Sequence, residues 1–178
     1  MRAGLRSLPE SLGALQELEE LFLFGNPLLR CLPRSLAGLR SLRCLSVGAC
    51  DLGSLPEGLC AGCGRLQDLH VSKNARLGRL PRDVGALAEL RKLSASGCGL
   101  TSLPDSLGQC ARLEELFLYG NKALRSLRAA GLQLRSQPGA TVSLPPSGAG
   151  VGHVSGSTRP PPPPPPSGAR KRHREHTV

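Results

Sequence analysis

The stretch "LEELFLFGNPLLRCLPRSLAGLRS" (18–41) decides the fold, because its spacing of leucines returns along the chain. Aligned on the first leucine of each row, five rows begin at Leu18, Leu42, Leu66, Leu90 and Leu113. The LxL segment of each row predicts a short strand with one apolar face. Strands repeated at a fixed period predict a parallel stack, in which no row can bury its leucines alone.

The rows follow the pattern LxxLxLxx(N/C)xLxxLPxxLxxL, with one more residue before the Leu-Pro pair in the Asn rows. This pattern resembles the leucine-rich repeat family, and its LPxxLxxL ending resembles the intracellular Ras-interacting and scaffold type of repeat. The resemblance covers about residues 5–134, including a partial first row at 5–15. It implies a short α/β solenoid with a parallel inner β-sheet and short helical segments behind it. We expect strands near residues 20–24, 44–48, 68–72, 92–96 and 115–119.

We therefore expect a solenoid over residues 1–134 and a disordered Gly/Ser/Pro-rich tail over 135–178. The first row lacks its strand half and the last row loses the Leu-Pro signature. Because solenoids need covered ends, the chain is expected either to be part of a longer protein or to have its ends covered by a partner.

The turn position after each strand is occupied in alternation by asparagine and cysteine: Asn26, Cys50, Asn74, Cys98 and Asn121. A polar side chain there can bond backbone groups that the turn leaves unpaired. We therefore expect Cys50 and Cys98 to be buried, unpaired and slow to react, and Cys44, which points away from the core, to react quickly. The odd count of seven cysteines and the lack of a signal-like apolar start favour reduced thiols in an intracellular protein.

The chain has its few aromatic residues in two copies of one eight-residue sequence motif, "EELFLFGN" (19–26) and "EELFLYGN" (114–121). They occupy strand positions that alternate with the core leucines, so we expect all of them on the concave face of the sheet. Exposed aromatics are enriched at binding hot spots; the alternative is that a duplication copied the phrase without selection for binding. We predict a partner-binding surface formed by Glu20, Phe22, Phe24, Ser46, Asp68, His70, Lys92, Ser94, Glu115, Phe117 and Tyr119.

Other chemical motifs are weak. "CAGC" (60–63) has the CxxC spacing, but no second ligand pair lies nearby in the sequence, so these cysteines are interpreted as structural. His70 stands beside Asp68 without a nucleophile in an obvious constellation, and we interpret it as a solvated residue of the interaction surface. We expect no catalytic residues, no cofactor and no metal. The resemblance likewise implies a non-enzymatic protein-binding module, with a signalling scaffold as one form of it.

The tail suggests a second class of function. The prolines Pro160–Pro166 favour an extended polyproline helix, and Arg159 completes a +xxPxxP spacing for a proline-recognition module; a stiff spacer is the alternative. The basic cluster at 169–176 and the net charge of +10 suit nucleic acid or nuclear import, or simply a solubilising tail. A nucleic-acid-associated or nuclear protein is therefore the alternative function. We expect a cytoplasmic location, with the nucleus as the second choice, and no membrane span.

Overall fold

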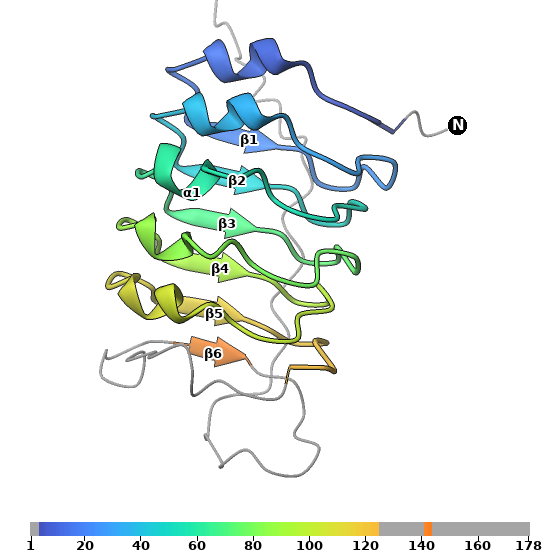
Figure 1. The fold of residues 1–178 in the computed structure, drawn as a ribbon, viewed down its shortest axis with the longest axis vertical. Coiled ribbons are helices and arrows are strands. Elements are labelled where there is room, and N and C mark those ends of the chain that lie inside the picture. The colour runs from blue at the N-terminus through green and yellow to red at the C-terminus, as the bar shows by residue number, and fades with distance from the viewer. Residues whose placement is uncertain (1–3, 125–140, 144–178) are drawn as a thin grey trace, which may run out of the picture.

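The computed structural model describes residues 4–124 and the backbone of residues 141–143. Its strands form one parallel sheet in chain order, and the short helices lie along the opposite side (Figure 1). The predicted parallel solenoid is confirmed. The strands are β1 (Glu20–Phe22), β2 (Cys44–Ser46), β3 (Asp68–His70), β4 (Lys92–Ser94), β5 (Glu115–Phe117) and β6 (Thr141–Ser143).

The assigned strands are shorter than the five residues expected, but the pairing continues beyond them. Leu23 N donates to Ser46 O at 2.7 Å, and Gly25 N donates to Gly48 O at 2.9 Å. The equivalent bonds join each later row to the next as far as Tyr119 O. Each row therefore remains attached to its neighbour until the chain reaches the turn.

Strand β6 corrects one expectation. It lies within 135–178, which the sequence analysis assigns to a disordered tail, and it pairs with β5 in the register Leu116 to Val142. The sequence "TVS" (141–143) places one β-branched apolar residue between two polar ones, a pattern that suits a strand. The weak signal was missed because no leucine row surrounds it. The rest of the expected tail lies outside the described residues.

The returning arcs carry the short helical segments expected behind the sheet. Each segment from the second row onward buries at least one apolar side chain, and Pro33 and Pro104, with φ near −65°, fix the approach of two of them. The segments are η1 (Glu10–Ala14), η2 (Arg34–Gly38), α1 (Leu59–Gly62), η3 (Val84–Ala86) and η4 (Asp105–Gln109), with Leu36, Leu59, Cys60, Val84 and Leu107 as the buried residues.

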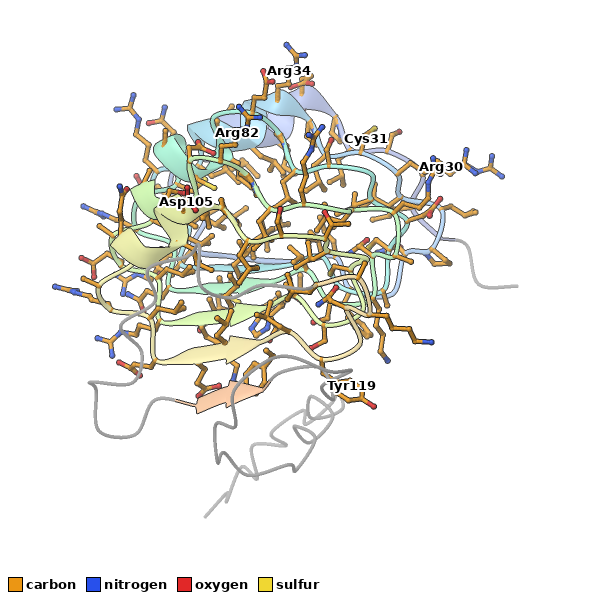
Figure 2. The ribbon with its side chains drawn as sticks, turned by 60° about the horizontal axis from the view of Figure 1, so that its bottom comes forward. Arg30, Cys31, Arg34, Arg82, Asp105 and Tyr119 are labelled. Atoms are coloured by element: carbon orange, nitrogen blue, oxygen red, sulfur yellow. The ribbon has the colours of Figure 1, made fainter. Side chains whose placement is uncertain are left out.

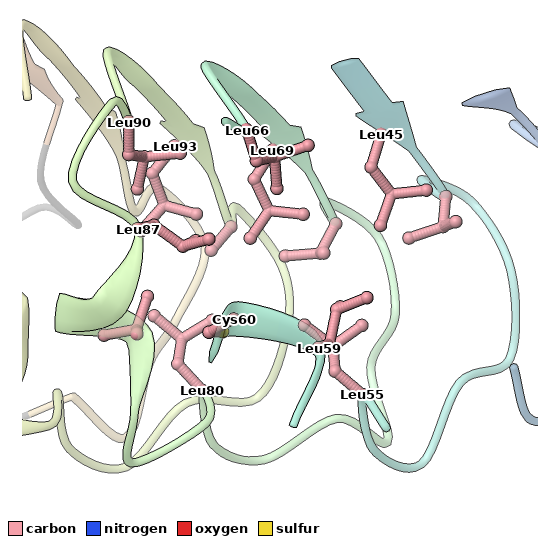
Figure 3. Close-up of a cluster of buried hydrophobic side chains, with 14 of the residues drawn as sticks. Leu45, Leu55, Leu59, Cys60, Leu66, Leu69, Leu80, Leu87, Leu90 and Leu93 are labelled. Atoms are coloured by element: carbon pink, nitrogen blue, oxygen red, sulfur yellow. The ribbon is translucent and has the colours of Figure 1, made fainter. Parts of the chain in front are cut away.

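The core is a continuous stack of leucines between the sheet and the helical segments (Figure 3). In the strands, Leu45, Leu69 and Leu93 are fully buried, because each has a paired row on both sides. Leu18 and Leu21 of the first row are only partly buried. Among the described strands, β1 pairs on one side alone, and this difference accounts for the exposure.

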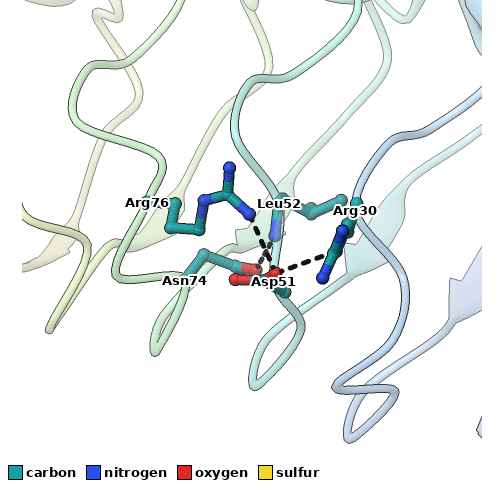
Figure 4. A network of polar contacts seen from close by, with 5 residues as sticks. All are labelled: Arg30, Asp51, Leu52, Asn74 and Arg76. Carbon is teal, nitrogen blue, oxygen red and sulfur yellow. Dashed lines mark hydrogen bonds and ion pairs between the residues drawn. The ribbon is translucent and has the colours of Figure 1, made fainter.

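The asparagines of the turn column link consecutive rows. Asn74 Nδ2 donates to Val71 O of its own row and to Val47 O of the preceding row, at 2.7 and 2.9 Å. Its Oδ1 accepts from Leu52 N at 3.0 Å, while the adjacent Asp51 carboxylate pairs with Arg30 and Arg76 from the flanking rows (Figure 4). One buried amide therefore satisfies three backbone groups of two rows.

The cysteines of the turn column make the complementary contact. Cys98 Sγ donates to Val71 O at 3.1 Å, and Cys50 Sγ donates to Leu23 O at 3.4 Å. Both side chains are buried and unpaired with other cysteines. Each thiol thus reaches back to the turn carbonyl of the preceding Asn row, as the amides of Asn74 and Asn121 reach back to Val47 O and Ala95 O of the preceding Cys rows.

The helical segments approach one another so closely that a small residue is required between them. A Cβ added at Gly62 would lie 1.9 Å from the carbonyl oxygen of Ala37, whereas a Cβ at Gly64 would have no heavy atom within 4 Å. Backbone atoms on a packed arc cannot move aside as a flexible side chain can.

Gly62→Ala is therefore expected to destabilise the protein by about 1–3 kcal/mol through overpacking. In an open helix the same change would stabilise by roughly 0.5–1 kcal/mol, so the sign of the effect is diagnostic. Urea unfolding of Gly62→Ala beside Gly64→Ala measures it. Equal midpoints for the two variants would show that the arcs are not in contact.

Asn74→Ala should lower the free energy of unfolding by about 2–4 kcal/mol, because Val47 O and Leu52 N would lose their bonds to the amide while buried, and Val71 O would keep only the weaker thiol donor of Cys98. Asn26 is half-buried and makes two such bonds, to Leu23 O and from Leu5 N. Asn26→Ala is accordingly the matched control, with the smaller loss. Thermal melts of the two variants compare them, and a larger loss for Asn26→Ala would contradict the linking role of Asn74.

Candidate functional site

The face of the sheet opposite the helical segments, called here the open face, carries every residue that the sequence analysis assigned to the partner-binding surface. Strand pairing sets these side chains in columns across the rows. The first column is Glu20, Cys44, Asp68, Lys92 and Glu115, and the second is Phe22, Ser46, His70, Ser94 and Phe117. Phe24 and Tyr119 follow two residues after Phe22 and Phe117 at the two ends of a third column.

Three of the four aromatic side chains are exposed as expected. Phe22 is 64% exposed, Phe24 55% and Tyr119 60%, and Tyr119 points outward at the lower right of the coloured ribbon in Figure 2. Space for the Phe24 ring is left by Gly48 in the next row, where a Cβ would lie 3.1 Å from the ring. The centre of the open face between these side chains is lined by small and polar residues.

Phe117 differs from the expectation, because it is half-buried. The ammonium group of Lys92, in the preceding row, lies 5.4 Å from the centroid of the Phe117 ring. The same Nζ pairs with Glu115 Oε2 at 2.7 Å. Lys92 therefore makes a cation–π contact with the Phe117 ring and, through the same ammonium group, neutralises the neighbouring carboxylate.

Ion pairs also join residues at equivalent positions of neighbouring rows. Glu19 pairs with Arg43, Glu114 with Arg91, and Glu89 with Arg112. Residues 23 or 24 positions apart in the sequence face each other across the stack, a signal that the repeat alignment contains and that the sequence analysis did not use. Within residues 4–124, Glu20 and Asp68 are the two carboxylates of the open face that form no ion pair.

His70 lies at the middle of the open face and is half-buried. Burial lowers the pKa of its imidazole, the Asp68 carboxylate opposes that change, and Lys92 adds to it. The ring is therefore mainly neutral at pH 7 and can donate one hydrogen bond and accept one.

The thiols of "CAGC" are set into the core and not into a reactive site. Cys60 and Cys63 are fully buried, and burial raises the pKa of Cys60 to about 12 and that of Cys63 to about 11. Cys63 Sγ donates to Leu36 O at 3.3 Å. In the part of the chain that the structure describes, no cluster of His, Cys, Asp and Glu is arranged to hold a metal ion.

The expectation for Cys44 needs correction. Its side chain is half-buried, and burial raises the pKa of its thiol to about 11, with further contributions from the charges of Asp68 and Glu20. Cys31 is instead the exposed thiol of the described residues. It lies on the arc just before the Leu-Pro pair, at a position that the strand alternation does not address.

The predicted tail features lie outside the described residues. These are Arg159, the prolines Pro160–Pro166 and the basic cluster at 169–176. Over the described residues, no helix has the length and apolar character to cross a membrane.

Comparison with known proteins supports the geometric description. Residues 89–110 match the family model described as "Leucine Rich Repeat". The structure superposes on the leucine-rich repeat domain of the type III effector XopL with a TM-score of 0.58 and 25% identity. The fold is a leucine-rich repeat solenoid. No curated protein matches the sequence.

Two plant structures are also similar. The repeat ectodomain of the Arabidopsis receptor kinase HAESA, in complex with an extended IDA peptide hormone, matches with a TM-score of 0.67 and 28% identity over 79% of this chain. The same receptor with the peptide and the co-receptor SERK1 matches at 30% identity. This chain spans 58% of the XopL chain and 24% of the HAESA chain. The Ras-interacting subtype expected from the LPxxLxxL ending is not decided by these similarities.

Labelling of native protein at pH 7 should modify Cys31 first and Cys44 much more slowly. Because a thiol with a pKa of about 11 gains tenfold in thiolate per pH unit, the rate at Cys44 should rise about 100-fold between pH 7 and pH 9. Mass spectrometry of peptides after timed quenching measures both rates. Fast reaction of Cys44 at pH 7, or of Cys50 and Cys98 in folded protein, would contradict the described burial.

Proposed function

We propose that this protein is a non-enzymatic protein-interaction module that binds a partner on the open, concave face of its sheet. The observation that carries the proposal is the set of exposed aromatic side chains, Phe22, Phe24 and Tyr119, gathered on one face of an otherwise leucine-built protein. Exposed large aromatics are costly in water and favour association. The partner is a protein or peptide, because leucine-rich repeat domains generally mediate protein–protein interaction.

The arrangement of the face fits an elongated ligand. Phe22 and Phe24 lie in the first row and Tyr119 in the fifth, four strand spacings away, or roughly 19 Å. Between them the face presents Ser46, His70 and Ser94, side chains that offer hydrogen bonds without filling space. The similarity to HAESA in complex with a peptide hormone is consistent with a ligand laid along the rows.

A signalling scaffold in the cytoplasm is the setting we propose for this module, on the basis of its LPxxLxxL rows and free thiols. The alternative function, a nucleic-acid-associated protein in the nucleus, rests on the basic cluster at 169–176. A steep loss of nucleic-acid affinity with rising salt would favour the alternative. Retention of a protein partner at the same salt favours the interaction module.

The decisive variant is Phe22→Ala combined with Phe24→Ala. It should weaken binding of a captured partner by about 2–4 kcal/mol, the range for hot-spot truncations, while the melting temperature stays nearly unchanged. Leu45→Ala, in the adjacent strand, is the matched control: it removes a fully buried leucine and should cost about 2–5 kcal/mol of stability. Thermal melts and affinities for both variants separate the roles. Unchanged affinity of the double variant for every captured partner would refute binding on this face.

A further inference from the structure

The two copies of the EELF phrase differ in what they contact, and the difference points to a ligand. In the last row, Glu115 and Phe117 hold one ammonium group between them: Lys92 Nζ lies 2.7 Å from Glu115 Oε2 and 5.4 Å from the Phe117 centroid. In the first row the same residue types, Glu20 and Phe22, stand at the same strand positions. Within the described residues, neither contacts a cation.

The geometric reason is that the cation held by Glu115 and Phe117 comes from the preceding row, and that the following row offers Cys44 and not a cation opposite Glu20. Lys92 belongs to β4, whose pairing with β5 sets Lys92 opposite Glu115 and Leu93 opposite Leu116. The edge of β1 that faces away from β2 has no strand partner among the described strands. Phe22, with a paired strand on one side, is 64% exposed, whereas Phe117, with paired strands on both sides and the Lys92 ammonium group over its ring, is half-buried.

The backbone and the core at the outer edge of β1 both favour a neighbouring extended segment that carries an apolar side chain. A strand edge presents unpaired N–H and C=O groups, which an extended segment can pair with by strand addition. Leu18 and Leu21 are only partly buried, although Leu45, at the register position of Leu21, is fully buried. An apolar side chain following the cation would cover Leu21 as Leu93 covers Leu116.

We propose that the outer edge of β1 binds an extended, lysine- or arginine-bearing segment of a partner protein, with its cation held between the Glu20 carboxylate and the Phe22 ring. The expected motif is a basic residue, an apolar residue, any small residue and a second apolar residue, the order found in "KLSA" (92–95). The inference rests on the proposed function, because it specifies the partner chemistry at the first row of the open face.

A second copy of this chain is a poorer occupant of the edge. Stacked end to end, it would offer β6, which carries Thr141 at the position that Lys92 takes in β4. Paired edge to edge through β1, it would offer the sequence ELF, which contains no basic residue. Charge complementarity therefore favours a basic segment from another protein.

The test uses the full chain and a synthetic peptide that copies residues 89–97, "ELRKLSASG", capped at both ends. The chain has three phenylalanines, so their ring resonances can be assigned from Phe22→Leu and Phe24→Leu and followed by NMR as peptide is added. Millimolar affinity is expected, because a short peptide loses much freedom on docking. The Phe22 ring should shift and saturate, and the Phe117 ring should not.

The charges are tested by matched changes. Replacing the peptide's lysine with glutamine removes both the cation–π contact and the ion pair and should weaken binding about five- to tenfold. Glu20→Gln in the protein removes the ion pair alone and should weaken binding about two- to fivefold. Glu115→Gln, the same change at the occupied copy, should leave peptide affinity unchanged. Equal binding of the lysine and glutamine peptides, or an unaffected Glu20→Gln variant, would overturn the proposal.

Other occupants would also be revealed. A second peptide copies residues 168–176. If it binds at Phe22 more tightly than "ELRKLSASG", with the same dependence on Glu20, the occupant of the edge would be the chain's own basic segment and not a partner protein. A dimer in sedimentation runs that Glu20→Gln dissociates would assign the edge to a second copy. Failure of the peptide overturns this inference alone, since the proposed function is judged separately by the Phe22→Ala/Phe24→Ala variant and its captured partners.

Discussion

The structure depends on the hydrogen bonds that join each row to the next, because no row encloses its own leucines. Strand pairing brings Leu45, Leu69 and Leu93 into one line, and each is buried only when rows lie on both sides. A parallel sheet is well suited to this, since identical spacing in every row keeps like positions in register over the whole stack. The same register then decides which polar side chains meet on the open face.

The turn column shows how the stack provides hydrogen-bond partners for the backbone groups at its buried turns. A buried carbonyl without a partner costs roughly 1–3 kcal/mol, and every turn leaves one behind. Val71 O accepts from both Asn74 Nδ2 and Cys98 Sγ, so the amide and the thiol serve the same atom from two rows. The amide also accepts a backbone N–H of the preceding row, which a thiol does only weakly.

The open face combines residues with opposite requirements. Burial of its exposed aromatic side chains by a ligand is favourable, whereas burial of its carboxylates without a cation carries a large desolvation cost. In the fifth row both requirements are met by Lys92 of the fourth row, which covers the Phe117 ring and pairs with Glu115. In the first row, Glu20 and Phe22 have no such cation among the described residues. Binding at that end should therefore favour ligands that carry an apolar surface and a positive charge together, and discriminate against purely apolar ones.

The sequence alone determined the row period, the parallel stack, the register of the core leucines and the side on which the aromatics stand. These follow from periodicity, since a two-residue alternation leaves one choice of buried face. The sequence also placed Asn and Cys at the turn, although it did not show that each bonds a neighbouring row.

Only the tertiary structure decided the environment of individual side chains. Phe117 is half-buried and Phe22 exposed, although both lie in an EELF sequence, because Lys92 lies 5.4 Å from the centroid of the Phe117 ring, whereas no described strand pairs with β1 on the side away from β2. Cys44 points away from the core as expected, yet burial raises the pKa of its thiol to about 11. Exposure and charge depend on which row stands alongside, and a pattern read along one row contains no information about its neighbour.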